Sequence, residues 1–378
     1  MNHEDQVKRE IPDASTGRGS NSVARPPVFM PSISSVLTPF EGKIGSAARR
    51  VALNQDMEIG DGRAKLGDLV VVEVITVGNV SHELELATGR IITPRAGDVL
   101  IGVIGSSRAI ARIIAPMPPD GFEIHHGVEL DLLNRGAMIG KVVEQIQAGH
   151  LTKVRCLGVI KRDGRVVNLK DYCLPFPPQL TPLPPLLIVA GTEMEVGKTE
   201  VCCGLIAALN QRGLKVCGAK LTGVAGLRDI LRLKDAGAFE VADFVDGGLV
   251  NTLTGDNVRE ATGVLLNYLA SLQPNVIVVE IGGSISLGAQ ILLDYQELRK
   301  YFSGIILSAV DVTAAFGGVE ALRRFHSLTT DAVGGPVANS EYYRDAVKRV
   351  TGVNACDFRH IGQCQAFINT MSARLCIG

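Results

Sequence analysis

The stretch Gly191–Thr199, which reads Gly-Thr-Glu-Met-Glu-Val-Gly-Lys-Thr, constrains the fold of this chain more than any other feature. It follows the apolar run 186–190 and precedes a segment with helical periodicity. A strand, a glycine-containing loop ending in Gly-Lys-Thr and a helix together form a phosphate-binding P-loop. The N–H groups of such a loop and of the first helical turn bind phosphate oxygens. We therefore predict a nucleotide-binding α/β domain.

Individual residues of this loop have distinct expected roles. Lys198 would place a positive charge near the β- and γ-phosphates, and the Thr199 hydroxyl would bind Mg²⁺. The usual pattern has its first Gly five positions before the second, where this chain has Thr192, and Gly191 lies one position earlier. The expected nucleotide-binding residues are Gly191, Thr192, Glu195, Val196, Gly197, Lys198 and Thr199.

Composition narrows the class of protein. A chain of 378 residues favours two domains, and the net charge of −1 gives no electrostatic case for nucleic acid or an anionic membrane as partner. Trp is absent and aromatic residues make up 4%, which argues against base-stacking platforms. A polar N-terminus without an apolar signal segment, and the absence of a membrane-length apolar run, favour a cytoplasmic protein.

The eight cysteines and the His125-His126 pair carry weaker signals. None of the cysteines forms Cys-x-x-Cys, and no Cys/His spacing is that of a zinc finger. Cys356, Cys364 and Cys376 are redox or metal candidates, with reduced cytosolic thiols the favoured interpretation. The His pair is interpreted as a loop feature in preference to a metal or acid–base site.

Four segments follow from the pattern along the chain. Residues 1–40 are expected to be a flexible tail. Residues 41–174 contain short β-type runs with turn signals between them, which favours a small barrel or sandwich with segment 116–127 as a loop over its mouth. The proline-rich stretch 175–185 is expected to be a semi-rigid linker. Residues 186–378 form the predicted P-loop domain.

In this last segment, strand and helix patterns alternate. A helix is expected over 198–212, with Gly213 ending it. Strand-like runs are predicted at 186–190, 215–221, 276–281, 304–309 and 335–338. Such alternation predicts a doubly wound, mainly parallel sheet with helices on both faces. Ligands of these sheets bind at the carboxyl ends of the strands.

Polar residues follow several of the predicted strands. They are Lys220, Glu280, Asp311, Asn339 and either Asp243 or Asp246. Phosphoryl transfer needs cations against the developing charge and carboxylates for the metal, so Lys198 and Lys220 are the catalytic candidates. The expected Mg²⁺ ligands are Thr199, Glu280 and Asp243. Asp311 is left open between a helix N-cap and a group behind the site.

These residues together resemble dethiobiotin synthetase. That family has a P-loop with the same extra spacing, a catalytic Lys at the second strand, a metal-binding Glu before a Gly-rich loop and an Ala-Asn element near the adenine. The matching positions are Lys220 with Thr222 and Gly223, Glu280 with Gly282 and Gly283, and Ala338 with Asn339. Glu193 and Met194 stand where the family has Asp and Thr. The resemblance covers residues 186 to about 345 and implies ATP and Mg²⁺ as cofactors, with a homodimer as the family expectation.

The β-rich N-terminal region makes the chain similar to a two-domain group with a dethiobiotin-synthetase-like second half, some members of which are associated with D-amino-acid N-acylation. The leading hypothesis is an ATP- and Mg²⁺-dependent ligase or transferase that phosphorylates a small carboxylate or carbamate. Two alternatives stay open: a nucleotide-dependent switch or metallochaperone ATPase, and a small-molecule kinase. The chain lacks the guanine-reading Asn-Lys-x-Asp, which favours ATP over GTP. Oligonucleotide binding by the β-rich region is the least favoured option.

Overall fold

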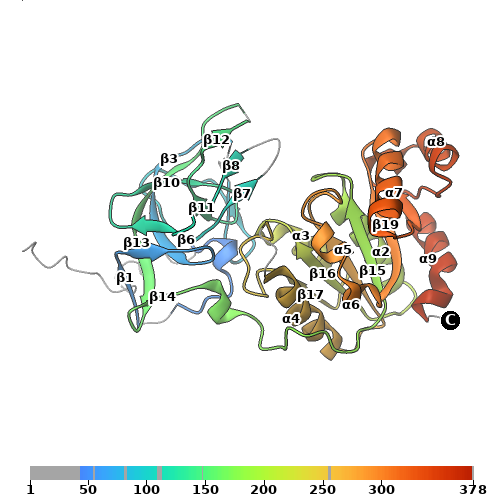
Figure 1. The fold of residues 1–378 in the computed structure, drawn as a ribbon, viewed down its shortest axis with the longest axis horizontal. Coiled ribbons are helices and arrows are strands. Elements are labelled where there is room, and N and C mark those ends of the chain that lie inside the picture. Colours follow the sequence, from blue (N-terminus) through green and yellow to red (C-terminus); the bar gives the residue numbers. More distant parts are fainter. Residues whose placement is uncertain are drawn as a thin grey trace, which may run out of the picture. The chain divides into compact units, whose positions relative to one another are not determined.

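The computed structural model describes residues 43–53, 56–80, 83–108, 113–146, 148–253 and 257–376, drawn in colour in Figure 1. The expected tail, 1–40, lies outside the described residues, as do positions 41 and 42 of the predicted β-rich region. All described residues belong to one compact unit of the chain. Within it, an N-terminal β region (43–174) precedes a C-terminal α/β region (186–376).

The N-terminal region consists mainly of short strands, and the C-terminal region alternates strands with helices. The N-terminal region contains η1 Ser46–Ala48, β1 Met57–Gly60, β2 Gly62–Ala64, β3 Leu69–Thr76, β4 Leu84–Glu85, β5 Ile91–Ile92, β6 Val99–Ile104, β7 Ser107–Arg108, β8 Ile113–Ala115, β9 Phe122–Ile124, β10 Glu129–Leu132, β11 Met138–Gly140, β12 Glu144–Gln145, β13 Lys153–Arg162, β14 Arg165–Val166 and η2 Leu169–Tyr172. The C-terminal region contains β15 Leu186–Gly191, α2 Lys198–Asn210, β16 Val216–Thr222, α3 Arg228–Asp235, β17 Glu240–Asp243, α4 Val258–Ser271, β18 Val276–Ile281, α5 Gln290–Leu293, α6 Gln296–Arg299, β19 Phe302–Ser308, α7 Val312–His326, β20 Ala332–Gly334, η4 Pro336–Asn339, α8 Glu341–Thr351 and α9 Ile361–Leu375.

The N-terminal region is a closed barrel. Strands β13, β10, β11, β6 and β3 pair in that order, and β3 pairs with β13 again to close the ring. Successive side chains of the valine-rich β3 point to opposite faces of the barrel wall. Val70, Val72 and Val74 pack in one buried cluster, and Leu69 and Val71 pack in another, as expected of a strand in a closed barrel. The barrel is thus the correct alternative of the two that the sequence left open.

One expectation for this region is wrong. Segment 116–127, predicted to be a loop, contains β9, which pairs antiparallel with β2. The segment's prolines and glycines hide a strand of only three residues, too short for a period to show in sequence.

The C-terminal region contains a six-stranded sheet in the order β17-β16-β18-β15-β19-β20, and each strand pairs in parallel with its neighbours in this order. The P-loop strand β15 lies between β18 and β19 near the middle of the sheet. The carboxyl ends of β15, β16 and β18 therefore meet at one edge, and the register pairs Lys220 of β16 with Glu280 of β18. Parallel pairing thus brings together two residues far apart in sequence.

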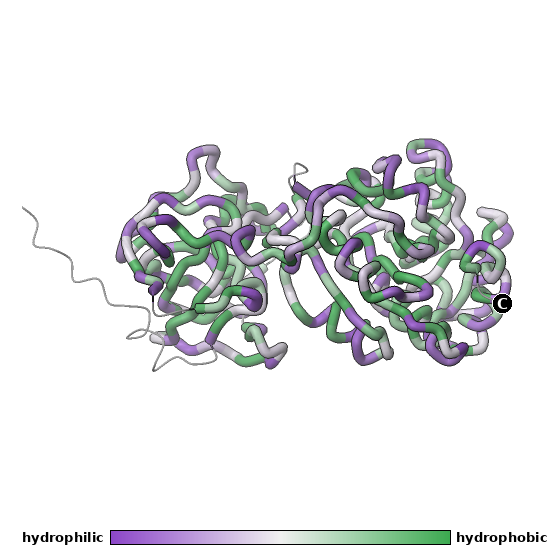
Figure 2. The backbone as a smooth tube through the Cα atoms, turned by 90° about the horizontal axis from the view of Figure 1, so that it is seen from below, coloured by the Kyte–Doolittle hydropathy of each residue, from purple (hydrophilic) through white to green (hydrophobic). Residues whose placement is uncertain are grey.

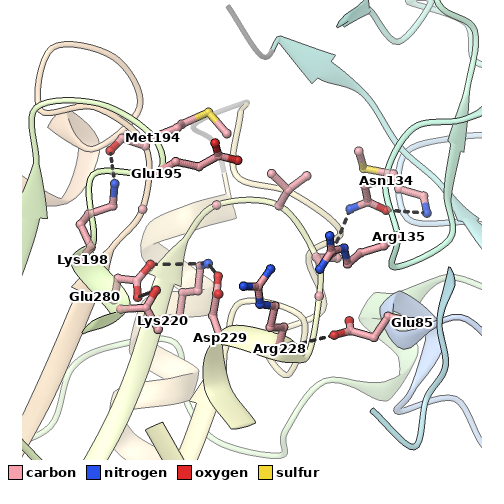
Figure 3. A pocket seen from close by; sticks show the side chains of 18 of the residues that line it. Glu85, Asn134, Arg135, Met194, Glu195, Lys198, Lys220, Arg228, Asp229 and Glu280 are labelled. Atoms are coloured by element: carbon pink, nitrogen blue, oxygen red, sulfur yellow. Dashed lines mark hydrogen bonds and ion pairs between the residues drawn. The ribbon is translucent and has the colours of Figure 1, made fainter. Parts of the chain in front are cut away.

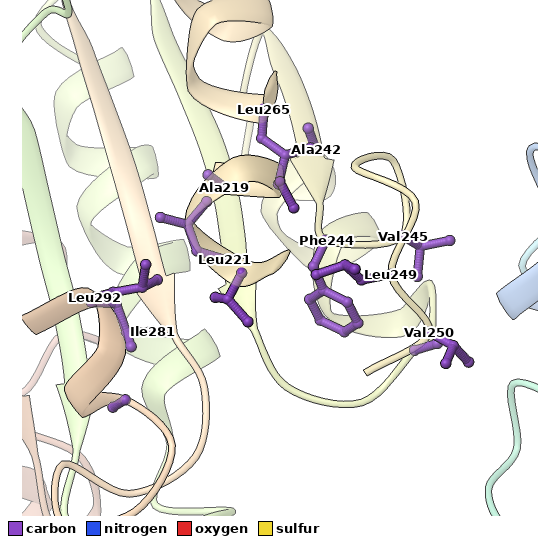
Figure 4. Close-up of a cluster of buried hydrophobic side chains, with 14 of the residues drawn as sticks. Ala219, Leu221, Ala242, Phe244, Val245, Leu249, Val250, Leu265, Ile281 and Leu292 are labelled. Atoms are coloured by element: carbon purple, nitrogen blue, oxygen red, sulfur yellow. The ribbon is translucent and has the colours of Figure 1, made fainter. Parts of the chain in front are cut away.

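Helices cover both faces of this sheet, as the doubly wound prediction requires. On one face, Leu187, Val189, Val276 and Val278 pack with residues of α2 and α9. On the other face, alternate residues of the same strands pack with α4, α5 and α7. Figure 4 shows part of that second cluster around Leu221, Phe244 and Leu265. Figure 2 shows hydrophobic segments running through the interior of the α/β region, where strands buried on both faces have continuous apolar runs.

The helix predicted at 198–212 and four of the five predicted strands match the observed elements to within about two residues, while β17 was not predicted. Gly213, at φ 75°, follows α2 as its expected stop, and its N–H donates to the Asn210 carbonyl at 2.8 Å. The strand expected at 335–338 is wrong, because the strand is β20, which ends at Gly334. Pro336, which has no N–H for a sheet ladder, opens the 3₁₀ helix η4 instead.

The proline-rich stretch 175–185 has neither helix nor strand and lies against α4. The Asn267 side-chain amide donates to the carbonyls of Pro177 (2.8 Å) and Gln179 (2.7 Å), and its oxygen accepts from the Thr181 N–H (2.9 Å). These bonds satisfy backbone groups that an extended segment cannot pair internally. The prediction that the stretch is a semi-rigid linker between independent domains stays a prediction.

A buried ion pair joins the barrel to the sheet. Arg49, which follows η1, donates to Asp243 Oδ1 at the end of β17 (2.5 Å) and contacts Asp246 Oδ2 (3.0 Å). Asp243 is fully buried. Burial works against the charge on Arg49, but the two carboxylates outweigh it and raise the pKa of the guanidinium. A buried carboxylate needs such a cation, so the pair ties the two regions together.

Removing Arg49 should therefore destabilise the whole chain. We expect Arg49→Ala to lower the free energy of unfolding by about 3–5 kcal/mol, because the fully buried Asp243 carboxyl loses the cation that compensates its burial. Because the chain has no Trp, urea unfolding should be followed by far-ultraviolet circular dichroism.

The matched control is Arg63→Ala, which breaks an exposed, solvent-screened ion pair with Glu123 on the barrel and should leave the free energy of unfolding nearly unchanged. The double variant Arg49→Ala/Asp243→Asn should recover part of the loss. Equal losses for Arg49→Ala and Arg63→Ala would contradict a structural role for the buried pair.

Candidate active site

The loop between β15 and α2 has the backbone shape of a phosphate cradle. Gly197 caps α2 in the left-handed region at φ 84°, and Glu195 adopts φ 59° although it has a side chain. A Cβ on Gly191 would lie 2.7 Å from Val196 Cγ2 and 3.0 Å from Lys198 Nζ, so the close packing there requires Gly. The longer loop with Thr192 in the usual Gly position is thus accommodated by the left-handed turn at Glu195.

Neighbouring strands hold this loop in place. The Thr192 N–H donates to the Ser308 carbonyl at the end of β19 (3.0 Å), and the Ser284 hydroxyl donates to the Thr192 carbonyl (2.8 Å). The Ser308 hydroxyl donates to the carbonyl of Val196, which is itself buried. The loop is therefore bound by the end of β19 and by the segment that follows β18.

Lys198, the first residue of α2, turns back over the loop. Its ammonium donates to the carbonyls of Glu193 (2.7 Å) and Gly283 (3.1 Å), and its side chain is buried. Burial lowers the pKa of Lys198 below its ordinary value of 10.5, although the nearby Glu280 opposes this shift. Lys198 thus holds its ammonium at the loop with carbonyl oxygens as partners, which phosphate oxygens can replace.

Glu280 links three elements at the sheet edge. The Thr199 hydroxyl of α2 donates to Glu280 Oε2 (2.8 Å), and Lys220 Nζ of β16 lies 3.5 Å from Glu280 Oε1. A hydroxyl and a carboxylate oxygen side by side are the ligand types that Mg²⁺ prefers, and Mg²⁺ sites keep several water and phosphate ligands besides. Thr199 and Glu280 therefore fit a Mg²⁺ ion next to the phosphate cradle.

Lys220 has a second carboxylate partner, Asp229 in the first turn of α3. Burial works against the charge of Lys220, but Glu280 and Asp229 outweigh it and raise the pKa of its ammonium above the ordinary value. Burial likewise opposes the charge of Asp229, and contact with Lys220 lowers the pKa of that carboxyl. Lys220 therefore stays protonated and fixed in direction (Figure 3).

A residue of the barrel positions α3. Glu85 of β4 is almost fully buried and accepts from the N–H groups of Leu227 (2.6 Å) and Arg228 (2.8 Å) and from the Ser46 hydroxyl (2.5 Å). α3 has no capping side chain of its own at Leu227, so this carboxylate does the work of an N-cap from the other region. Glu85 thereby sets where Asp229 meets Lys220.

These residues open into one pocket of about 580 Å³. Figure 3 shows Lys198, Lys220 and Glu280 on one side and the barrel residues Asn134 and Arg135 on the other. The described residues that line it include Met194, Glu195, Gly197, Lys198, Thr199, Glu200, Lys220, Arg228, Asp229, Arg232 and Glu280 from the α/β region, and Val80, Glu83, Glu85, Leu133, Asn134, Arg135 and Met138 from the barrel. The pocket is therefore larger than the phosphate cradle alone.

Asp243 was predicted to be a Mg²⁺ ligand, but the structure gives its carboxylate another partner. Its Oδ1 binds Arg49, its Oδ2 is buried without a hydrogen-bond partner among the described residues, and it does not line the pocket. The register places Asp243 beside Lys220, as strand-end reasoning expects, but the ion pair with the barrel takes its carboxylate. Asp229 is the acidic residue that reaches Lys220 from this side instead.

Other predicted residues lie away from the pocket. Asn339 is exposed at the end of η4, and its expected place near the adenine stays a prediction. Asp311 caps α7, since its carboxylate accepts from the Ala314 N–H (2.7 Å), which settles the alternative left open for it.

The histidine and cysteine candidates do not assemble into a site. In the part of the chain that the structure describes, no group of three His, Cys, Asp or Glu side chains is placed to hold a metal. The His125 ring lies 3.1 Å from the His126 carbonyl on an exposed loop. Cys356 and Cys364 are buried thiols, and burial raises the pKa of Cys356 to about 12. None of the helices among the described residues is long and apolar enough to cross a membrane.

Sequence reasoning missed three residues of this site, Asp229, Arg228 and Glu85. Asp229 had a usable signal, because an acidic residue in the first turn of a helix that follows a strand lies at the ligand-binding edge of such a sheet. Glu85 had none, since its partners in α3 are about 140 positions away in sequence.

Comparisons with known proteins identify no family for this chain. No protein-family model matches the sequence, and no curated protein matches it either. Solved structures with some similarity are signal recognition particle receptors. FtsY from Elizabethkingia anophelis in complex with GDP is 14% identical with a TM-score of 0.31, over 41% of this chain and 50% of that one. A second structure of FtsY from Elizabethkingia anophelis is 12% identical with a TM-score of 0.35, over 55% of this chain and 75% of that one.

Chloroplast FtsY from Physcomitrella patens is 14% identical with a TM-score of 0.34, over 54% of this chain and 70% of that one. This chain spans half the length of the first of these structures. These values are too low to assign a function, and the neighbours give no support to the dethiobiotin synthetase resemblance in particular. The P-loop type of nucleotide site rests on the strand, loop and helix geometry described above.

The capping role of Glu85 can be tested by hydrogen exchange. We expect Glu85→Ala to speed exchange of the Leu227 and Arg228 amides and of the first turn of α3 by about fivefold, because a lost N-cap costs about 1 kcal/mol. Mass spectrometry of peptides from 225–235 measures this. Glu83→Ala, which removes a half-exposed partner of Arg135, is the control and should leave α3 unchanged. Unaltered protection of α3 in Glu85→Ala would contradict the role.

The lowered pKa of Lys198 predicts a pH dependence. Below this pKa the ammonium is charged and attracts phosphates, and as the pH rises through it the charge and the affinity are lost. We expect the Kd for a fluorescent ADP, measured without Mg²⁺, to rise by about tenfold per pH unit, starting at a lower pH than an ordinary Lys would give. Lys198→Arg should keep a flat profile, because Arg stays charged. An equally steep rise in Lys198→Arg would assign the titration to another group.

Proposed function

We propose that this chain binds ATP with Mg²⁺ at the P-loop and transfers the γ-phosphoryl group to a small acceptor in the same pocket. The observation that carries the proposal is the extent of the pocket, which continues from Lys198 past Lys220 to the barrel. Its volume of about 580 Å³ lies in the range of small-molecule sites. A P-loop that only bound a nucleotide would not need a buried, oriented second lysine.

The loop residues would bind the nucleotide. The N–H groups of residues 193–199 and the Lys198 ammonium would take the β- and γ-phosphate oxygens, as the left-handed turns at Glu195 and Gly197 favour. Thr199 and Glu280 would hold Mg²⁺, which when bound would neutralise charge on the phosphate oxygens. Binding in this way fixes the γ-phosphorus at the edge of the pocket that Lys220 borders.

Lys220 would act on the transferred group. Its ammonium is held by Asp229 and Glu280, so it supplies a fixed positive charge where negative charge develops. The acceptor oxygen attacks the γ-phosphorus, the bond from that phosphorus to the β–γ bridging oxygen breaks, and ADP leaves. A carboxylate or carbamate acceptor would yield an acyl phosphate open to attack by an amine, which is the ligase or transferase form of the proposal. A hydroxyl acceptor would make the protein a kinase.

A second candidate function, a nucleotide-dependent switch, is favoured by a different observation. The barrel binds the loops that border the site, since Asn134 donates to the Ala225 carbonyl (2.8 Å) and Asn251 donates to the Ser106 carbonyl (2.8 Å). If these loops moved when the γ-phosphate binds or is lost, the barrel residues bound to them would move as well. In this case no small acceptor is consumed.

The two lysines should separate binding from transfer. We expect Lys198→Ala to lose measurable ATP binding, and Lys220→Ala to keep binding within about threefold while acceptor-dependent ADP release falls by about 10²–10³-fold. Calorimetry measures the first, and ADP release over a metabolite pool measures the second. Lys348→Ala on α8, which lies outside the pocket, is the control.

Because Lys220→Ala leaves two carboxylates without their cation, Lys220→Ala/Asp229→Asn serves as a second, better-folded variant. Full acceptor-dependent turnover in both variants would overturn the role of Lys220. ATP hydrolysis that no metabolite stimulates, together with nucleotide-dependent hydrogen exchange in the barrel, would favour the switch over phosphoryl transfer.

A further inference from the structure

The charges that line the pocket are unevenly matched. The described lining residues include the cations Lys198, Lys220, Arg135, Arg228 and Arg232. Three of them have a carboxylate partner: Arg135 contacts Glu83, Arg232 contacts Glu200, and Lys220 contacts Asp229 and Glu280. Lys198 holds carbonyl oxygens of the phosphate cradle. Arg228 is left with a guanidinium for which the described residues provide no hydrogen bond or ion pair.

The position of Arg228 at the start of α3 is also unfavourable for a positive side chain. Arg228 is the first residue of α3, where a positive side chain adds to the positive end of the helix dipole and is unfavourable. Its own N–H and that of Leu227 are already taken by Glu85, so the helix N-terminus has no N–H of these two to offer a ligand. Figure 3 shows the Arg228 side chain in the pocket between Asp229 and the barrel. The guanidinium is therefore the group at this point that can receive an anion.

We propose that Arg228 binds a carboxylate of the acceptor. The substrate is then a small organic anion. Its carboxylate is either the group that accepts the phosphoryl group or a second group of the same molecule. The proposal rests on the proposed function, which supplies the acceptor. The planar fork of a guanidinium matches a carboxylate with two parallel hydrogen bonds. Arg228 is next in sequence to Asp229, which contacts Lys220, so an acceptor bound there lies beside the transferred group.

The structure also explains how Arg228 is aimed. Glu85 fixes the first turn of α3, and Asn134 holds the preceding loop through the Ala225 carbonyl. Both residues belong to the barrel, whose Val80, Leu133 and Met138 line the same pocket. The barrel therefore sets the position of the carboxylate-binding residue and forms a wall against which the remainder of the acceptor would lie.

The test uses the full chain saturated with Mg²⁺ and β,γ-methylene-ATP, which occupies the P-loop and Lys198. Short mono- and dicarboxylates, α-amino acids included, are titrated by calorimetry, each paired with its amide. We expect at least one carboxylate to bind and its amide not to, with Arg228→Gln binding that carboxylate about 10- to 100-fold more weakly. Arg228→Lys should be intermediate, because it keeps the charge and loses the fork. Arg323→Gln, on α7 and paired with Glu320, should match the unaltered chain.

Each other outcome has a defined meaning. If no carboxylate binds, or if Arg228→Gln binds it as well as the unaltered chain does, the inference is overturned while the nucleotide site stands. If orthophosphate binds through Arg228 and no carboxylate does, the site belongs to a phosphorylated ligand and the carboxylate assignment is overturned. If the ATP analogue binds Lys198→Ala as tightly as the unaltered chain, the proposed function fails first and this inference falls with it.

Discussion

The site depends on one buried carboxylate, that of Glu280 at the end of β18. A carboxylate in that position is unfavourable unless donors or cations surround it, and Thr199 and Lys220 provide them from the two neighbouring chain segments. The parallel register decides which segments these are, because β16 lies next to β18 and brings Lys220 to the height of Glu280. The P-loop helix, the second strand and the metal-binding candidate are thus held together by a single charged group.

The barrel takes part in the same arrangement. Two of its residues bind acidic or helix-terminal groups of the α/β region: Arg49 neutralises Asp243, and Glu85 caps α3. Both contacts are buried, so neither region keeps its polar groups satisfied without the other. The α3 cap extends this dependence to the chemistry, since α3 carries both Asp229, which contacts Lys220, and Arg228, which lines the same pocket. The barrel is therefore part of the site's structure and more than an attached module.

Local pattern sufficed for much of the fold. The strands of the sheet are apolar runs buried on both faces, and α2 has a clear stripe and a Gly stop, so both were predictable from a window of neighbours. Short elements were not, as the three-residue β9 and the misassigned strand at 335–338 show, because so few residues contain no period. Asp243 was predicted as a metal ligand, and neither its strand β17 nor its partner Arg49, which lies far away in the chain, was predicted.

By itself, the sequence determined the phosphate-binding loop, the α/β class and the residues Lys198, Thr199, Lys220 and Glu280 at one sheet edge. These depend on short-range geometry: a glycine turn that points N–H groups one way, and strands whose carboxyl ends meet whenever they pair in parallel. Only the tertiary structure decided that the barrel caps α3, that Asp243 serves an ion pair, and that the Arg228 guanidinium lines the pocket without a partner among the described residues. Those contacts join residues distant in the chain, and no local pattern encodes which distant charge a buried group will meet.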